Sequence, residues 1–156
     1  MAIRIIDYGT DDYQKMVDLR YQILRKPLGL QFNQVELEEE KNDILIGCFD
    51  EDKLEGCCIL TPLDNKKVRL RQMAVIDGLQ GKGIGRSLMN YAENIARDMG
   101  YDVLCMHARK TAVGFYEKLG YQIASPEFNE VNIPHYMMKK KFEIKKFAFF
   151  RKEYVI

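Results

Sequence analysis

The sequence predicts one mixed α/β domain, and three observations lead to this class. Its 156 residues are the size of a single ordinary domain, long enough to bury a sizeable core. Hydrophobic residues make up 47% and charged residues 30% of the chain, a balance typical of globular proteins and not of disordered ones. Apolar strand-like runs alternate with segments of helical periodicity. We therefore expect strands and helices packed around a shared core.

The elements are expected in the order β-α-β-β-β-α-β-α-β-β. Thr10 is a candidate N-cap for a first helix that begins near Asp11 and that Pro27 ends. The turn at 50–53 joins two strands as a hairpin, and Gly100 supplies a left-handed residue after the next helix. The crossover around that helix should make its two flanking strands parallel. The expected strands are 2–6, 44–49, 54–61, 68–75, 103–108, 121–124 and 135–142, and the later helices are 83–99 and 112–119.

Charge and hydropathy exclude several classes of function. Lysine and arginine number 24 and aspartate and glutamate 23, which leaves a net charge of +1. This near balance argues against a dedicated nucleic-acid binder, which is usually clearly basic. No apolar run approaches the roughly 18–20 residues of a membrane-spanning helix, and the start of the chain lacks the apolar segment of a signal peptide. We therefore expect a cytoplasmic protein with no nucleic-acid or membrane partner.

The four cysteines lie in apolar, strand-like runs. Cys57 and Cys58 are adjacent, whereas Cys48 and Cys105 are isolated, and no Cys-x-x-Cys or Cys/His spacing typical of a zinc site exists. We expect reduced thiols that pack as small hydrophobic side chains, and no metal.

The most informative segment is the loop Gln80–Arg86, between an expected strand and an expected helix. Three glycines at alternate positions let the backbone approach a ligand closely, and two basic residues add positive charge. The start of the helix leaves N–H groups unpaired and presents the positive end of the helix dipole. These features together predict an anion site, most naturally for phosphate. The residues are Gly81, Lys82, Gly83, Gly85 and Arg86.

Two common phosphate-binding motifs do not fit this loop. In a P-loop read from Gly78 and Gly83, Ile84 stands where lysine is required. In a dinucleotide fingerprint read from Gly81 and Gly83, Arg86 stands where the third glycine is required. A nucleotide-binding Rossmann protein is therefore disfavoured.

The pattern that fits is Gln-x-x-Gly-x-Gly, and with it the sequence resembles the GNAT superfamily of N-acetyltransferases. The resemblance continues in the strand before the loop and in a second signature further along the chain. Two later segments are similar to a bacterial single-domain subgroup of that superfamily. The resemblance covers roughly residues 1–142. The matching segments are Met73–Val75, Gln80–Gly85, His107–Ala108, Phe115–Tyr121 and Asn132–His135.

This resemblance implies an acetyl-CoA-dependent N-acetyltransferase that acts on a primary amine of a small molecule or peptide. It implies the GNAT acyl-CoA N-acyltransferase fold, a central twisted mixed sheet with flanking helices, in which strands 68–75 and 103–108 splay apart. Pantetheine would then pair with the free strand edge, and the pyrophosphate would bind the glycine loop. The cofactor-binding residues expected from the resemblance are Met73, Ala74, Val75, Gln80, Gly81, Lys82, Gly83, Ile84, Gly85 and Arg86.

Tyr116 matches the family tyrosine that gives a proton to the departing thiolate. A phenol with a pKa near 10 suits that role, and the alternative is a tyrosine packed in the core beside Phe115. The general base is open, because the strand that carries a glutamate in many relatives offers Arg69, Arg71 and Gln72 instead. His107 and His135 are candidate acceptor contacts, with a structural role or a role as base as alternatives, and water alone is a further alternative.

The acceptor cannot be named from its two expected loops, 26–43 and 125–135. Residues 28–42 lack clear periodicity, so we expect an irregular, acidic and mobile stretch, from which Glu38, Glu39 and Glu40 could lie over the acceptor cleft and attract a cation.

Residues 143–156 form a C-terminal extension in which large apolar residues stand among basic ones, among them Ile144, Phe147, Phe149, Phe150, Tyr154 and Val155. We expect it to pack on the domain or on a partner subunit, and a homodimer is one of these alternatives. A non-catalytic acyl-CoA-binding or regulatory module on the same fold is the alternative to an enzyme.

Overall fold

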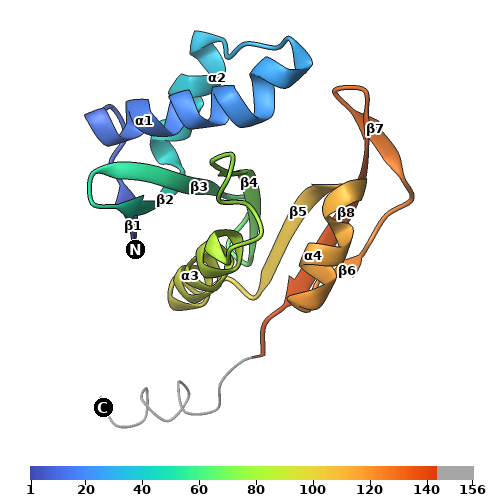
Figure 1. Ribbon diagram of the computed structural model, residues 1–156. Helices are drawn as coiled ribbons and strands as arrows, with labels where there is room; N and C mark the ends of the chain where they lie inside the picture. Colours follow the sequence, from blue (N-terminus) through green and yellow to red (C-terminus); the bar gives the residue numbers. More distant parts are fainter. Residues whose placement is uncertain (144–156) are drawn as a thin grey trace, which may run out of the picture.

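An eight-stranded mixed sheet runs through the centre of the protein (Figure 1). The computed structural model describes residues 1–143, so most of the expected extension, 144–156, lies outside the described residues. The strands are β1 (Ala2–Ile6), β2 (Ile44–Asp50), β3 (Lys53–Pro62), β4 (Lys67–Val75), β5 (Val103–Arg109), β6 (Gln122–Ile123), β7 (Phe128–Glu130) and β8 (Ile133–Lys141). Their order in the sheet is β1-β2-β3-β4-β5-β8-β6, and β7 pairs with β8.

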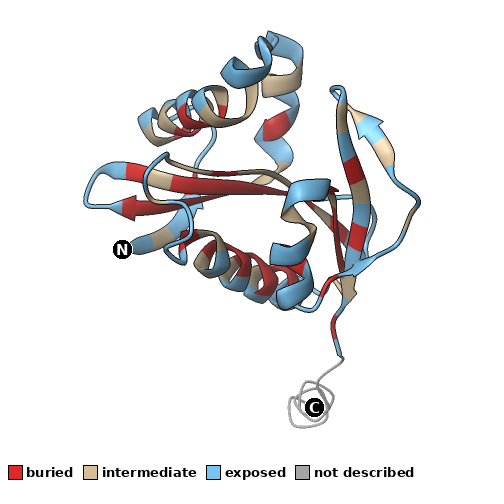
Figure 2. Cartoon of the chain, turned by 45° about the vertical axis from the view of Figure 1, so that its right-hand side comes forward, coloured by how far each residue is buried: buried red, intermediate tan, exposed pale blue. Residues whose placement is uncertain are grey.

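Helices cover both faces of this sheet (Figure 1). They are α1 (Asp11–Arg20), α2 (Gln34–Glu38), α3 (Ile84–Asp98) and α4 (Val113–Lys118). Helix α1 buries Tyr13, Met16 and Leu19 in one apolar cluster, whereas α3 and α4 bury residues in a second. Neighbouring residues of one strand contribute to opposite clusters, as Leu45 and Ile46 do, because successive side chains point to opposite faces. Figure 2 shows the result as buried residues in the central strands and along the inner sides of α1 and α3.

The two adjacent cysteines obey the same alternation. Cys57 belongs to the cluster under α1 and Cys58 to the cluster under α3. All four cysteines are buried and unpaired, which confirms the expected reduced thiols.

The first helix begins as predicted and ends differently. Thr10 is its N-cap, and the Oγ1 atom accepts a hydrogen bond from the Tyr13 N–H at 3.3 Å. Regular α-helical geometry ends at Arg20, and the chain continues through a π-helical turn, Tyr21–Arg25, and a 3₁₀ turn, Lys26–Leu28. Pro27 therefore lies in the first positions of the 3₁₀ turn, where a missing N–H does no harm.

The expectation that residues 28–42 are irregular is wrong for residues 34–42, whereas residues 29–33 have no helix or strand. Asn33 and Glu36 form a reciprocal capping box: the Glu36 N–H donates to Asn33 Oδ1 at 2.8 Å, and the Asn33 N–H donates to Glu36 Oε1 at 3.0 Å. Helix α2 starts there and runs into a 3₁₀ turn, Glu39–Asn42. The spacing Asn-x-x-Glu was the sequence signal for this helix.

Strands β4 and β5 are parallel, as predicted from the crossover, but only along part of their length. Lys67–Leu70 pairs with Val103–Met106, and beyond those residues the two strands have no pairing. Strand β4 carries one extra residue opposite β3 between Arg71 and Ala74, and Gln72 takes a left-handed φ of 56°. Such a bulge bends the bulged strand, which accounts for its departure from β5. The expected splay of the two strands is therefore present.

Within residues 1–143, no helix combines the length and the apolarity that crossing a bilayer requires.

Candidate active site

A cavity of about 600 Å³ lies where β4 and β5 separate. It is large enough for a small ligand together with the reactive end of a longer one. Its wall comes from the turn after α1, from α2, β4, β5 and α4, and from the hairpin of β7 and β8. The lining residues are Leu24, Arg25, Leu30, Glu36, Arg69, Leu70, Arg71, Gln72, Met73, Met106, His107, Ala108, Arg109, Ala112, Phe115, Tyr116, Glu130, Val131 and His135.

The cavity connects the two faces of the sheet. Leu70, Met106 and Ala108 share the core cluster of α3 and α4 with Tyr116. The alternating neighbours in the same strands, among them Arg69 and His107, lie on the opposite face. A molecule held on the side of α3 and α4 can therefore meet a molecule that enters beside α1, α2 and β7.

The glycine loop forms an open cradle before α3. Gly81 and Gly83 have left-handed φ values of 80° and 91°, and a Cβ atom at either position would meet nothing within 4 Å. Gly83 is the N-cap of α3 and gives no side-chain cap, and the first bonded amide is that of Ser87, which donates to the Gly83 carbonyl at 3.0 Å. Free helix-start amides beside two exposed basic residues suit a phosphate group. Those basic residues are Lys82 and Arg86.

The loop is tied back to β4 by Gln80. Its Nε2 atom donates to the Val75 carbonyl at 3.1 Å. On the other side of the strand, the Ile76 N–H donates to the main-chain carbonyl of Glu55 in β3 at 2.9 Å. Because main-chain groups alternate along a strand, Val75 and Met73 present theirs to the gap left by β5. This is the free strand edge that the resemblance implies.

The remaining expected cofactor residues occupy three different settings. Met73 lines the cavity, whereas Ala74 is buried under α1 and lies opposite Cys57 of β3. Ile84 is buried and packs on Gly56, where an added Cβ atom would lie 2.8 Å from the Ile84 Cγ2 atom. Ile84 thus places the start of α3 close to the sheet, and the glycine at position 56 permits that approach.

Tyr116 lies in α4 and lines the cavity, with 6% of its surface exposed. Its ring meets Phe115 and Tyr121 edge to face, at centroid distances of 5.0 and 6.0 Å. Burial raises the pKa of the phenol, and the nearby Cys58 adds to the increase. The hydroxyl has no hydrogen-bond partner within residues 1–143. A protonated phenol is therefore free to donate to a ligand in the cavity.

The two histidines are brought together on the other side of the cavity by Glu130. The His107 Nδ1 atom lies 3.0 Å from Glu130 Oε1 and 3.0 Å from Arg69 Nη2. Arginine only donates and a carboxylate only accepts, so this nitrogen serves one of the two partners at a time. The His135 Nδ1 atom donates to the Ile133 carbonyl at 2.7 Å, and its Nε2 atom lies 3.6 Å from Glu130 Oε2.

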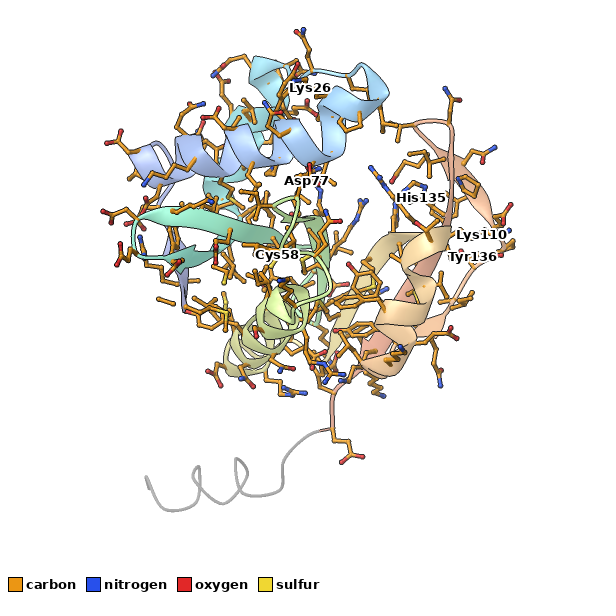
Figure 3. The ribbon with its side chains drawn as sticks, viewed as in Figure 1. Lys26, Cys58, Asp77, Lys110, His135 and Tyr136 are labelled. Atoms are coloured by element: carbon orange, nitrogen blue, oxygen red, sulfur yellow. The ribbon has the colours of Figure 1, made fainter. Side chains whose placement is uncertain are left out.

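Phe128 holds both rings in place, stacked on His135 and edge-on to His107. In Figure 3, His135 of β8 lies on the side of that strand that faces α1, whereas Lys110 and Tyr136 lie further out. Burial would raise the pKa of Glu130, but the hydrogen bond from His107 and the nearby positive charges outweigh it and lower that pKa. Glu130 therefore stays a carboxylate.

The expectation that Glu38, Glu39 and Glu40 attract a cation over the cleft is wrong, because none of them lines the cavity. Glu40 is buried and paired with Arg20, with contacts of 2.8 Å (Nη1–Oε1) and 2.6 Å (Nη2–Oε2). It also accepts a hydrogen bond from the Tyr13 hydroxyl at 2.7 Å. This carboxylate fixes α1 to the segment after α2.

Glu130 is a candidate site residue that sequence reasoning missed, because strand β7 was missed. The hairpin turn between β7 and β8 is Val131-Asn132, and both residues have left-handed φ values, 46° and 62°. Such turns usually carry Asn-Gly or Asp-Gly, so a β-branched residue here gave little signal. The asparagine was the only cue.

Comparison with known proteins identifies the family. The family model of the acetyltransferase (GNAT) domain matches residues 22–142, and the chain belongs to this family. The uncharacterized N-acetyltransferase YjcF of Bacillus subtilis is 32% identical over 106 residues, which are 67% of this chain and 74% of the relative.

Two solved structures share the fold. A crystal structure of an aminoglycoside 6′-N-acetyltransferase complexed with coenzyme A has a TM-score of 0.79 at 20% identity, covering 93% of this chain and 99% of that chain. A GNAT family acetyltransferase from Elizabethkingia anophelis with acetyl-CoA bound has a TM-score of 0.69 at 19% identity, covering 90% of this chain and 97% of that chain.

The protein is thus an N-acetyltransferase that uses acetyl-CoA, as the sequence predicted, and its mixed α/β fold is the expected one. The non-catalytic module and the Rossmann protein are set aside.

Proposed function

We propose that the cavity between β4 and β5 is where the acetyl group passes to a primary amine of a small molecule or peptide. The observation that carries this proposal is the position of the Tyr116 hydroxyl, which has no partner within residues 1–143 and opens on the cavity that joins both faces of the sheet. The donor would lie on the side of α3 and α4, and the amine would enter between α1, α2 and β7.

The residues on the donor side fit acetyl-CoA. The main-chain groups of Met73 and the Val75 N–H can pair with the pantetheine amides, as an added strand would, while the Val75 carbonyl accepts from Gln80. The cradle of Gly81 to Arg86 can hold the pyrophosphate, with Lys82 and Arg86 beside it. Bound there, acetyl-CoA supplies an acetyl group activated as a thioester.

Tyr116 acts as the general acid in this proposal. The amine nitrogen forms a bond to the acetyl carbon, and the bond from that carbon to sulfur breaks. The Tyr116 hydroxyl gives its proton to the departing sulfur, which leaves as a thiol. The acylated nitrogen loses one proton as the amide forms, and that proton returns the Tyr116 phenolate to a phenol. Burial disfavours the phenolate, which favours this return and also makes Tyr116 a weaker acid than a free phenol.

The histidines contact the acceptor, and His135 can take its proton. Since the His135 Nδ1 atom donates to the Ile133 carbonyl, the neutral ring has its lone pair on Nε2, within the cavity wall. An acceptor ammonium group that loses its proton there becomes the neutral amine that the reaction requires.

The substitution Tyr116→Phe tests the assignment of the acid. It should leave the affinity for acetyl-CoA unchanged and lower kcat by about 10²–10⁴, because only the phenolic proton is removed. The matched control is Tyr121→Phe, which removes a buried hydroxyl that donates to Glu93 at 2.7 Å, away from the cavity. Equal kcat for Tyr116→Phe and wild type, with acetyl transfer shown to be rate-limiting, would return Tyr116 to a packing role.

We also propose that residues 1–142 are the catalytic domain and that 143–156 pack on it or on a partner subunit. The large apolar side chains in that extension support this, since they are costly to leave in water. Deleting residues 143–156 should lower the melting temperature or change the mass in solution. An unchanged melting temperature together with an unchanged mass would contradict it.

A further inference from the structure

The wall of the cavity carries more positive than negative charge. Four arginines line it against two glutamates, an excess of two positive charges when the histidines are left out of the count. The arginines come from the turn after α1 and from strands β4 and β5. These residues are Arg25, Arg69, Arg71 and Arg109, with Glu36 and Glu130.

Two of the four arginines have carboxylate partners. Arg25 lies 3.4 Å from Glu36, and Arg71 lies 3.8 Å from Asp43. Arg109 has no ion pair or hydrogen bond through its side chain within residues 1–143. Arg109 is therefore an uncompensated cation in the wall.

Arg69 is only partly satisfied. Its Nη2 atom reaches His107, but its Nε atom is buried and has no hydrogen-bond partner in the described part of the chain. Burial lowers the pKa of this guanidinium, and the nearby Arg71 contributes to the decrease. A buried donor without a partner is costly unless a ligand supplies the acceptor.

The sheet register places these two arginines around the histidines. Arg69 lies opposite Cys105 of β5, two positions before His107, and Arg109 follows two positions after it. Arg109 is directly opposite His135 of β8. Side chains two apart on a strand share a face, so Arg69, His107 and Arg109 face the acceptor side together.

We propose that the acceptor is a small amine that also carries an anionic group, a carboxylate or a phosphate, and that Arg109 and Arg69 bind this group. The inference rests on the proposed acetyl transfer in the same cavity. Guanidinium groups match both anions through paired, charge-assisted hydrogen bonds. The nearness of the arginines to His135 places the anion close to the reacting nitrogen, as in an α-amino acid. A polycationic acceptor would meet like charges in the wall instead.

Binding to the full-length protein saturated with CoA tests this without turnover. Calorimetric titrations compare L-leucine with L-leucinamide and phosphoethanolamine with ethanolamine, and spermidine serves as a polycation. The anionic member of at least one pair should bind at least tenfold more tightly than its neutral partner. The pair in which this difference is seen shows whether the site prefers a carboxylate or a phosphate. Neutral members or spermidine binding as tightly as the anionic members would overturn the proposal.

The substitution Arg109→Gln locates the anion site. It should weaken binding of the preferred anionic amine at least tenfold, while affinity for the neutral partner and for CoA changes less than twofold. Lys41→Gln is the matched control, because Lys41 is exposed and does not line the cavity. Undiminished anion binding by Arg109→Gln would overturn the assignment. A failure of the proposed acetyl transfer would appear in a different measurement. In that case no amine would cause CoA release from acetyl-CoA, although the protein would still bind the anionic amines more tightly than the neutral ones.

Discussion

The two sides of the cavity are built from different parts of the chain. On the side of α3, the expected donor site consists mainly of main-chain groups from one continuous segment, Met73 to Arg86. On the side of α1 and β7, the wall consists of charged side chains that come from α1, α2, β4, β5 and the β7–β8 hairpin. The first construction depends on glycines at a fixed spacing, and the second depends on how distant elements pack.

This difference predicts different responses to substitution. A main-chain site is damaged by adding a side chain, with little effect on the rest of the fold. A side-chain site is damaged by removing charges, including the buried charges that hold its elements together.

The largest effect is expected for Arg20→Met, on the acceptor side. Arg20 and Glu40 are both almost fully buried, with exposed fractions of 0% and 2%, and the change leaves the carboxylate unpaired in the core. Breaking such a pair costs about 3–5 kcal/mol of the free energy of unfolding. Urea denaturation measures it.

The control for that change is Arg25→Met, which breaks the partly exposed pair with Glu36 at 3.4 Å. It should cost less than about 1 kcal/mol. Equal losses for the two variants would show that the buried pair does not anchor α1 to the segment after α2.

An intermediate effect is expected for Gly83→Asp, on the donor side. The position has a φ of 91°, which a side chain rarely adopts, and the new carboxylate would face the pyrophosphate. The affinity for acetyl-CoA should fall at least tenfold, about 1.4 kcal/mol, by calorimetry. Gly100→Ala adds strain at a φ of 89°, at the far end of α3, and should leave that affinity unchanged. A Gly83→Asp protein that binds acetyl-CoA like wild type would place the site elsewhere.

The smallest effect concerns pH and Glu130. Its pKa is lowered in the folded protein, so the folded state favours the carboxylate, and the unfolded chain takes up a proton first as the pH falls. The associated stability is present above the usual pKa range of glutamate and is lost as the pH falls through the lowered value. Because the group is part exposed, the loss should stay below about 1 kcal/mol. Urea midpoints for wild type should fall more steeply in this window than those of Glu130→Gln, and parallel curves would contradict the assignment.

Much of the fold was predictable because its cues are local. The strands of the sheet follow from apolar runs, and the cap at Thr10 and the end of α3 at Gly100 follow from single residues. Two elements, α2 and β7, were not predicted, and each has a physical reason. Helix α2 has only five residues and too little length for periodicity, and β7 has three residues before a turn without glycine.

The residues of the candidate site likewise fall into those that local motifs predicted and those that only tertiary packing brings together. The glycine loop and Tyr116 were predicted from motifs within the sequence. Glu130 reaches His107 only through the β7–β8 hairpin, and Arg69 reaches it only through the parallel register of β4 and β5. Glu40 was misassigned because nothing in a run of glutamates shows which one is buried against Arg20. Such contacts depend on tertiary packing, which a single sequence does not display.

Burial of the cysteines should make the folded enzyme slow to react with thiol reagents. Burial raises the pKa of all four thiols, to about 12 for Cys57, and only the thiolate attacks a disulfide or an alkylating agent. Released CoA, by contrast, presents a thiol in open water. A disulfide reagent that releases a coloured thiolate should therefore report the CoA formed by turnover. The cysteines of the folded enzyme should add little to that signal. The same reagent finds four further thiols per chain when the core opens, so it also counts unfolded molecules.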